Sequence, residues 1–154
     1  ATYAQLLAQA NRIARVLVED LKLVPGNRVL LRAPNNPMMA ACWLAVVKAG
    51  LIAVATMPLL RAKELKQIID KARVGAALCD VRLQDEMAAA RAQCPDMKQV
   101  LYFNDGTPGS LDALAAAKPG TFDNVDTALE DPCLIAFTSG TTGQPKGTVH
   151  FHRD

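Results

Sequence analysis

Apolar residues recur at helical spacing in the first part of the chain. Between positions 3 and 22 they fall three or four residues apart, which places them on one face of a helix. Thr2 and Gln5 match a capping box at the start of this segment. The same spacing predicts further helices over 37–49, 61–73 and 83–92, and a short one that begins after Ser110.

Short apolar runs separate these helices and have the length of buried strands. They lie at 28–32, 51–55, 76–79, 99–103 and 133–137. Strands that alternate with helices predict an α/β fold with a parallel sheet and helices on both of its faces. In such sheets, ligands bind beyond the carboxyl ends of the strands. We therefore expect the chemistry of this chain to lie in the segments that follow its strands.

One of these segments, Thr138–Gly147, has a composition that no packed core element shows. It contains three glycines, four hydroxyl side chains, one proline and one lysine, and it follows the apolar strand 133–137. Glycines let the backbone come close to a ligand and turn its N–H groups toward an anion. Hydroxyl groups add neutral donors, and Lys146 adds a mobile positive charge suited to phosphate. The segment therefore predicts a loop that binds phosphate.

The spacing of the glycines differs from two widespread phosphate-binding patterns. Counting from Gly140, the second glycine of a G-x-x-x-x-G-K-[ST] pattern would fall at Pro145, and no G-x-G-x-x-G occurs. The alternative is an ordinary surface turn rich in Ser, Thr and Gly. That alternative is less favoured here because strand, loop, lysine and a second β-like run, 148–151, follow one another in order.

Composition and charge exclude several classes of protein. The formal charge is +2, from 17 basic and 15 acidic residues, and no basic run is interleaved with aromatic residues, so we expect no nucleic-acid partner. No apolar stretch is long enough to span a bilayer. The cysteines contain no C-x-x-C pair and sit in apolar contexts, which predicts buried free thiols and a cytoplasmic location; they are Cys42, Cys79, Cys94 and Cys133.

The segment Thr138–Gly147 resembles the phosphate-binding signature of the adenylate-forming superfamily, which comprises acyl- and aryl-CoA ligases, peptide-synthetase adenylation domains and luciferases. Val46–Gly50 is similar to a helix end of the same superfamily, and weaker similarity extends over nearly the whole chain. Pro58–Arg61 and His150–Asp154 look most like the benzoate and 2-aminobenzoate CoA ligase branch.

This resemblance implies an ATP-dependent carboxylic acid–CoA ligase that acts on an aromatic acid such as benzoate or 2-aminobenzoate. The acid carboxylate attacks the α-phosphate of ATP and gives an acyl-adenylate and pyrophosphate, and the thiol of coenzyme A then displaces AMP. Mg²⁺ is implied with the ATP. The residues that the resemblance assigns to the ATP phosphates are Thr138, Ser139, Gly140, Thr141, Thr142, Gly143, Lys146 and Gly147.

The resemblance also implies that residues 1–154 are part of a large N-terminal domain, with the remainder of that domain and a C-terminal domain absent. We therefore expect no catalytic residue in this chain, no ligase activity from it alone, and no ATP, Mg²⁺ or coenzyme A bound to it. Two alternatives stay open: a non-catalytic phosphate-binding or interaction module, and an adenylation domain that loads a carrier protein. The reading frame of the gene beyond Asp154 would discriminate between them.

Other clusters of polar residues favour simpler interpretations. His150 and His152 supply two ligands where a metal site needs three or four. The acidic residues between 123 and 131 have no fixed spacing, so we predict no metal site. The charges of helix 61–73 are typical of a solvated face with a Lys66–Asp70 pair.

The apolar strands also lead to a prediction about association. They require cover on both faces of the sheet, and the predicted helices cover only part of that area. We expect an exposed apolar patch and an unpaired strand edge near 133–152, and therefore self-association through this surface.

Overall fold

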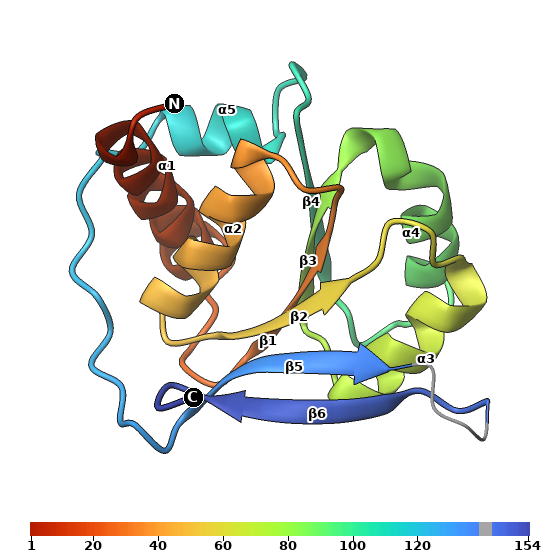
Figure 1. Ribbon diagram of the computed structural model, residues 1–154. Helices are drawn as coiled ribbons and strands as arrows, with labels where there is room; N and C mark the ends of the chain where they lie inside the picture. The colour runs from red at the N-terminus through yellow and green to blue at the C-terminus, as the bar shows by residue number, and fades with distance from the viewer. Residues whose placement is uncertain (139–142) are drawn as a thin grey trace.

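Five strands lie parallel in one sheet, and a sixth lies antiparallel at its edge. The computed structural model describes residues 1–138 and 143–154, and its strands follow one another across the sheet in the order β4-β3-β1-β2-β5-β6 (Figure 1). The parallel strands begin and end at β1 (Arg28–Arg32), β2 (Ile52–Thr56), β3 (Ala76–Asp80), β4 (Gln99–Phe103) and β5 (Pro132–Thr138). The antiparallel edge strand is β6 (Lys146–Phe151).

Helices cover both faces of the sheet, as the alternating pattern predicts. The first layer consists of α1 (Tyr3–Arg15), α2 (Pro37–Lys48) and α5 (Leu111–Ala116), which pack on one face. The second consists of α3 (Ala62–Ala72) and α4 (Gln84–Arg91), which pack on the other, α4 being preceded by a 3₁₀ turn, Val81–Leu83. Figure 1 shows the two layers on opposite sides of the strands.

Successive strand residues supply the two layers in turn. Leu30 packs in the cluster of α3 and α4, whereas its neighbours Val29 and Leu31 pack in the cluster of α1, α2 and α5. This alternation follows from the two-residue period of a strand, whose side chains point to opposite faces. Because both faces are covered, β1 is apolar along its interior, as is typical of a parallel sheet.

The first helix ends differently from its prediction. The α-helix reaches Arg15, and a π-helix continues the segment over Val16–Asp20, so helical structure ends two residues before position 22. The amide of Leu21 donates to the carbonyl of Val16, five residues earlier, and Lys22 then adopts a φ of 56°. The wider turn was not expected, because apolar spacing does not distinguish an α-helix from a π-helix that continues it.

The connector between α5 and β5, residues 117–131, contains no helix and runs along the first helical layer. Side chains of α1 hold its backbone: Asn11 Nδ2 donates to the carbonyl of Gly120 at 2.9 Å, and Arg12 Nε donates to that of Lys118 at 3.2 Å. Further along, the amide of Val125 donates to the carbonyl of Lys48 at the end of α2. These contacts bring the chain from α5, beside β4, across to the other side of the sheet, where β5 pairs with β2.

Candidate phosphate-binding site

The predicted phosphate loop joins β5 to β6 at the carboxyl edge of the parallel strands. Because β5 is parallel to β2 and β1, its last residue, Thr138, lies at the same edge as Thr56 and Arg32. This is the edge at which α/β sheets bind ligands. The prediction that the loop follows a strand on this edge is therefore confirmed.

Part of the predicted loop is strand. Thr138 pairs with Lys146, and Phe137 pairs with Gly147, so both ends of the segment belong to an antiparallel hairpin. The expectation that Lys146 lies on a loop was wrong, because backbone pairing with β5 extends β6 to this residue. Lys146 remains exposed, so its side chain is accessible from solvent. The predicted site residues Ser139, Gly140, Thr141 and Thr142 lie outside the described residues.

Two positions of the site, 143 and 147, favour glycine for different physical reasons. Gly143 has a φ of +74° and open space around the position of a Cβ, so the backbone conformation itself favours glycine there. Gly147 has no positive φ. A Cβ at this position would lie 3.2 Å from Ile135 Cγ2 and 3.2 Å from Phe137 Cζ, which is tighter than ordinary packing. Gly147 therefore lets β6 lie over two apolar side chains of β5.

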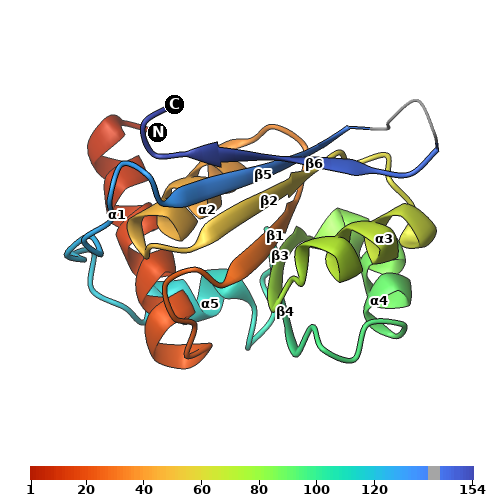
Figure 2. The ribbon, with the colours of Figure 1, turned by 90° about the horizontal axis from the view of Figure 1, so that it is seen from below.

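Helix α3 forms the wall beside this hairpin. A cavity of about 490 Å³ lies between them, lined on the hairpin side by Phe137, Thr138, Gly143 and Pro145. The opposite wall comes from α3 and the end of β2, with Thr56, Lys63, Glu64 and Gln67 as its polar members. Viewed from below, the start of β6 lies on the side of the molecule occupied by α3 (Figure 2). The hairpin and α3 thus enclose a partly polar space at the carboxyl edge.

One hydrogen bond joins α3 directly to the loop. Lys71 Nζ donates to the carbonyl oxygen of Pro145 at 2.9 Å. Lys66, five residues earlier, instead pairs with Asp70 on its own helix, as predicted. Of these two lysines, Lys71 is therefore the one that contacts the segment carrying Lys146.

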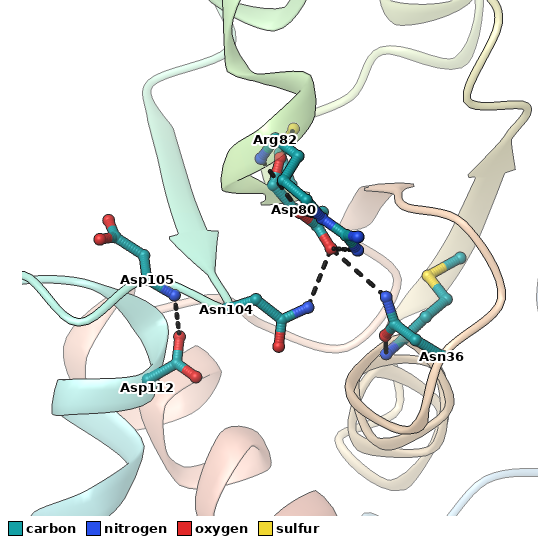
Figure 3. Close-up of polar contacts among 8 residues, drawn as sticks. Asn36, Asp80, Arg82, Asn104, Asp105 and Asp112 are labelled. Atoms are coloured by element: carbon teal, nitrogen blue, oxygen red, sulfur yellow. Dashed lines mark hydrogen bonds and ion pairs between the residues drawn. The ribbon is translucent and has the colours of Figure 1, made fainter.

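A second polar cluster lies at the carboxyl ends of β1, β3 and β4, and sequence reasoning did not identify it (Figure 3). The Asp80 carboxylate is fully buried and accepts hydrogen bonds from three side chains. Its partners are Arg82 Nη2 at 2.7 Å, Asn104 Nδ2 at 2.9 Å and Asn36 Nδ2 at 3.3 Å. Asn36 also caps α2, since its Oδ1 accepts from the amide of Met39 at 2.9 Å. The carboxylate thus ties together the segments that follow three strands.

Hydrogen bonds set the ionisation of this cluster. The side-chain hydrogen bonds from Arg82 hold the pKa of Asp80 well below its usual range and outweigh the opposing effect of burial. The same contact raises the pKa of Arg82. A carboxylate so stabilised is a poor proton acceptor near neutral pH, so we interpret the cluster as a structural tie. Its sequence signal was the placement of polar residues at or shortly after the ends of strands β1, β3 and β4.

Arg32 is a buried charge on the other face of the sheet. It is only 2% exposed, and its guanidinium makes long hydrogen bonds to two carbonyls, those of Met57 at 3.4 Å and Leu83 at 3.5 Å. Burial lowers its pKa. Nearby, Glu86 of α4 accepts a hydrogen bond from the amide of Ala62 at 2.7 Å, which stabilises the start of α3. These contacts fix the turn between β2 and α3, which forms one end of the cavity.

The remaining predicted candidates do not gather into a site. Within 1–138 and 143–154, no group of three or more His, Cys, Asp or Glu side chains is placed to hold a metal ion. His150 lies in β6 and His152 in the turn that follows it. Cys42, Cys79 and Cys94 are buried free thiols, whereas Cys133 is only half-buried. Burial raises the pKa of Cys79 to about 12. No helix in the described residues is long and apolar enough to cross a membrane.

Comparison with known proteins agrees with this geometry. Residues 1–154 match the family described as AMP-binding enzyme. The chain belongs to this family. Among curated relatives, it is 31% identical to the "uncharacterized acyl-CoA ligase YtcI" of Bacillus subtilis (strain 168) over 98% of this chain and 28% of the relative. It is 28% identical to "benzoate-CoA ligase" of Thauera aromatica over 99% of this chain and 29% of the relative.

Solved structures share this fold. The anthranilate CoA ligase AuaEII, solved in complex with anthranoyl-AMP, superposes with a TM-score of 0.90 at 25% identity, over 97% of this chain and 29% of that one. This match confirms the predicted fold class. The relatives are not uniform in substrate, because they include a long-chain fatty acid CoA ligase of Mycobacterium tuberculosis, FadD13, at 33% identity. The chain spans less than a third of the length of the curated relatives described above.

Proposed function

We propose that this chain is the phosphate-binding part of an AMP-forming carboxylic acid–CoA ligase. The observation that carries the proposal is the β5–β6 hairpin, which places Gly143 and the exposed Lys146 together at the carboxyl edge of the sheet. The family match and the acyl-CoA ligases among the relatives support it. In this reaction the carboxylate of the acid attacks the α-phosphate of ATP, the bond to pyrophosphate breaks, and the thiol of coenzyme A then displaces AMP.

The described residues fit the polyphosphate of ATP. Lys146 supplies a mobile positive charge. Thr138, which pairs with Lys146 across the hairpin, supplies a hydroxyl group. Gly143, which lines the cavity, lets the backbone turn with a positive φ and adds no side chain there. Together these groups hold the β- and γ-phosphates and stabilise the negative charge that builds on departing pyrophosphate. Ser139, Gly140, Thr141 and Thr142 complete the phosphate site in this proposal.

The described residues do not by themselves fit Mg²⁺. Among the residues that line the cavity, Glu64 is the one carboxylate, and its Oε2 accepts a hydrogen bond from the amide of Arg61 at 3.1 Å. A Mg²⁺ site needs octahedral oxygen ligands, usually one or two carboxylates together with substrate phosphates and waters. We therefore assign no step of the reaction to a metal held by this chain.

We further propose an aromatic acid, such as benzoate or 2-aminobenzoate, as the substrate. Benzoate-CoA ligase among the relatives and the anthranilate CoA ligase structure support this choice, and the fatty acid CoA ligases among the relatives define its main competitor. A cytoplasmic location belongs to the same proposal, because four free thiols suit a reducing compartment.

Acid-dependent exchange of radiolabelled pyrophosphate into ATP, measured on the full product of the gene, tests the proposal. We expect exchange with benzoate or 2-aminobenzoate and little with octanoate or palmitate, followed by release of free aryl-CoA when coenzyme A is added. Preference for the fatty acids would contradict the aromatic assignment alone. Product that forms only on a carrier protein would favour an adenylation domain, and absence of exchange with any acid would favour a non-catalytic module.

A further inference from the structure

Helix α3 presents one face to the predicted phosphate loop along most of its length. Lys63, Gln67 and Lys71 are spaced four residues apart, and such residues lie above one another on one side of a helix. Lys63 and Gln67 line the cavity beside the hairpin, and Lys71, one turn further on, donates to the carbonyl of Pro145. This face therefore contacts the loop through a direct hydrogen bond at its C-terminal end.

The acceptor of this hydrogen bond lies next to Lys146 in the sequence. Pro145 immediately precedes Lys146, which begins β6 and pairs with Thr138. Proline has no backbone N–H, so this residue contributes to backbone hydrogen bonding only through its carbonyl. That carbonyl is the group that Lys71 binds, at 2.9 Å. The contact thus restrains the arm of the loop that carries Lys146.

We propose that Lys71 is a positioning residue, whose hydrogen bond to Pro145 holds the arm of the phosphate loop so that Lys146 meets the ATP phosphates. This inference rests on the proposed function and extends it to a residue outside the loop. Lys71 touches no phosphate in this arrangement and acts through Pro145. Its charge also adds to the positive field around an anionic ligand, since Lys63 lies on the same face of α3.

A simpler role for Lys71 makes a different prediction. A cation in the last turn of a helix stabilises that helix through its dipole, whether or not it contacts the loop. If this were its whole role, loss of the charge would loosen α3 and leave the loop unchanged. The positioning role predicts the reverse, because the hydrogen bond joins two elements that are far apart in the sequence.

Hydrogen exchange in the 154-residue chain separates these two roles without any nucleotide. We expect Lys71→Met to speed exchange of the amides at the start of β6, from Lys146 onward, about 3- to 10-fold, the range for loss of one exposed hydrogen bond, while α3 amides change little. Lys71→Arg, which keeps a donor of similar reach, should restore slow exchange. Lys66→Met is the matched control, because Lys66 pairs with Asp70 within α3. Unchanged exchange of these amides in Lys71→Met, or no recovery in Lys71→Arg, would contradict the proposal that the Lys71–Pro145 hydrogen bond restrains the loop.

Kinetics of the full gene product then test the consequence for ATP. A misplaced Lys146 loses contact with the phosphates of bound ATP and with the departing pyrophosphate, so Lys71→Met should lower kcat/KM for ATP several-fold and by less than Lys146→Met does. Lys71→Arg should return kcat/KM to the unsubstituted value, and Lys66→Met should leave it unchanged. An unchanged kcat/KM in Lys71→Met, or no recovery in Lys71→Arg, would refute the positioning role. Absence of adenylation in the unsubstituted protein would contradict the proposed function. Hydrogen exchange would still show whether the Lys71–Pro145 hydrogen bond restrains the loop.

Discussion

Val125 lies so close to Gly50 that a Cβ at position 50 would be 2.8 Å from Val125 Cγ1 and 3.2 Å from its Cβ. The backbone holds the valine in place, because its amide donates to the carbonyl of Lys48 at 2.9 Å. Gly50 itself turns the chain from α2 into β2 with a φ of +71°. Gly50 therefore allows the turn after α2 and also the close packing of the connector that leads to β5.

This relationship predicts a larger loss of stability at Gly50 than at a comparable glycine. Gly26 has a φ of +88° and nothing within 4 Å of its Cβ position, so Gly26→Ala suffers backbone strain alone, about 1–2 kcal/mol. Gly50→Ala suffers the same strain and an overpacking cost of about 1–3 kcal/mol. Urea unfolding of the two variants measures the difference. Equal losses would show that Val125 moves aside freely, and Gly50→Ala with Val125→Ala should remove only the overpacking part.

The Asp80 cluster predicts a stability that depends on pH. Asp80→Asn removes the charge that organises Arg82, Asn104 and Asn36, and we expect it to lower the free energy of unfolding by about 1–3 kcal/mol at pH 7. Asp123→Asn, at an exposed connector position, is the matched control and should change stability little. Urea unfolding at pH 7 checks both variants, and a loss no greater than that of the control would contradict the structural role.

The sign of the pH effect follows from the lowered pKa of Asp80. An unfolded aspartate titrates near pH 3.9, about the value in model peptides, and the folded carboxylate titrates lower. The stabilising contribution is therefore fully present above about pH 4 and is lost as the pH falls through the folded pKa. The difference between the unsubstituted chain and Asp80→Asn should consequently shrink in this acidic range. A difference that grows as pH falls would show that another group dominates.

The sequence allowed the elements to be placed because local signals marked their ends. Strand β1 lies where it was predicted, bounded by a turn in which Gly26 takes the positive φ that its position requires and the amide of Asn27 bonds to Val24. Asn36 and Ser110 cap α2 and α5, as their side-chain chemistry indicated. Each of these features depends on a few neighbouring residues, so a single sequence carries enough information.

Features that depend on distant partners could not be found in this way. The buried network of Asp80 joins residues from the ends of three strands, and no local pattern shows that they meet. The direction of β6 is a partial exception. A parallel neighbour needs a crossover of about a dozen residues or more, and the connection between Thr138 and Lys146 is too short for one. The sequence therefore contained evidence for an antiparallel hairpin at the phosphate loop.

Lys146 is predicted to act in the reaction and not in the fold. In the full gene product, Lys146→Met should slow pyrophosphate exchange by about 10-fold or more, because it removes a charge that stabilises the departing pyrophosphate. The side chain is exposed, so urea unfolding of the 154-residue chain should change by less than about 0.5 kcal/mol. Lys98→Met, at another exposed lysine, controls for the loss of one positive charge. Normal exchange at saturating ATP in Lys146→Met would exclude the proposed role.

The edge of the sheet predicts self-association of the 154-residue chain. Among the residues that the structure describes, β6 pairs with β5 alone and forms the edge of the sheet, so its outer side can pair with another chain, and Val149 in its centre is 45% exposed. Burial of apolar surface contributes about 25 cal/mol per Å², which favours association through this strand once the cost of ordering is met. Light scattering should therefore give a mass above that of one chain as concentration rises. Val149→Lys should restore the monomer, whereas Leu59→Lys, at an exposed apolar position on the β2–α3 turn, should not. A monomer at all concentrations, without binding of a hydrophobic dye, would contradict this prediction. It would show that β6 is a stable edge strand without a partner chain.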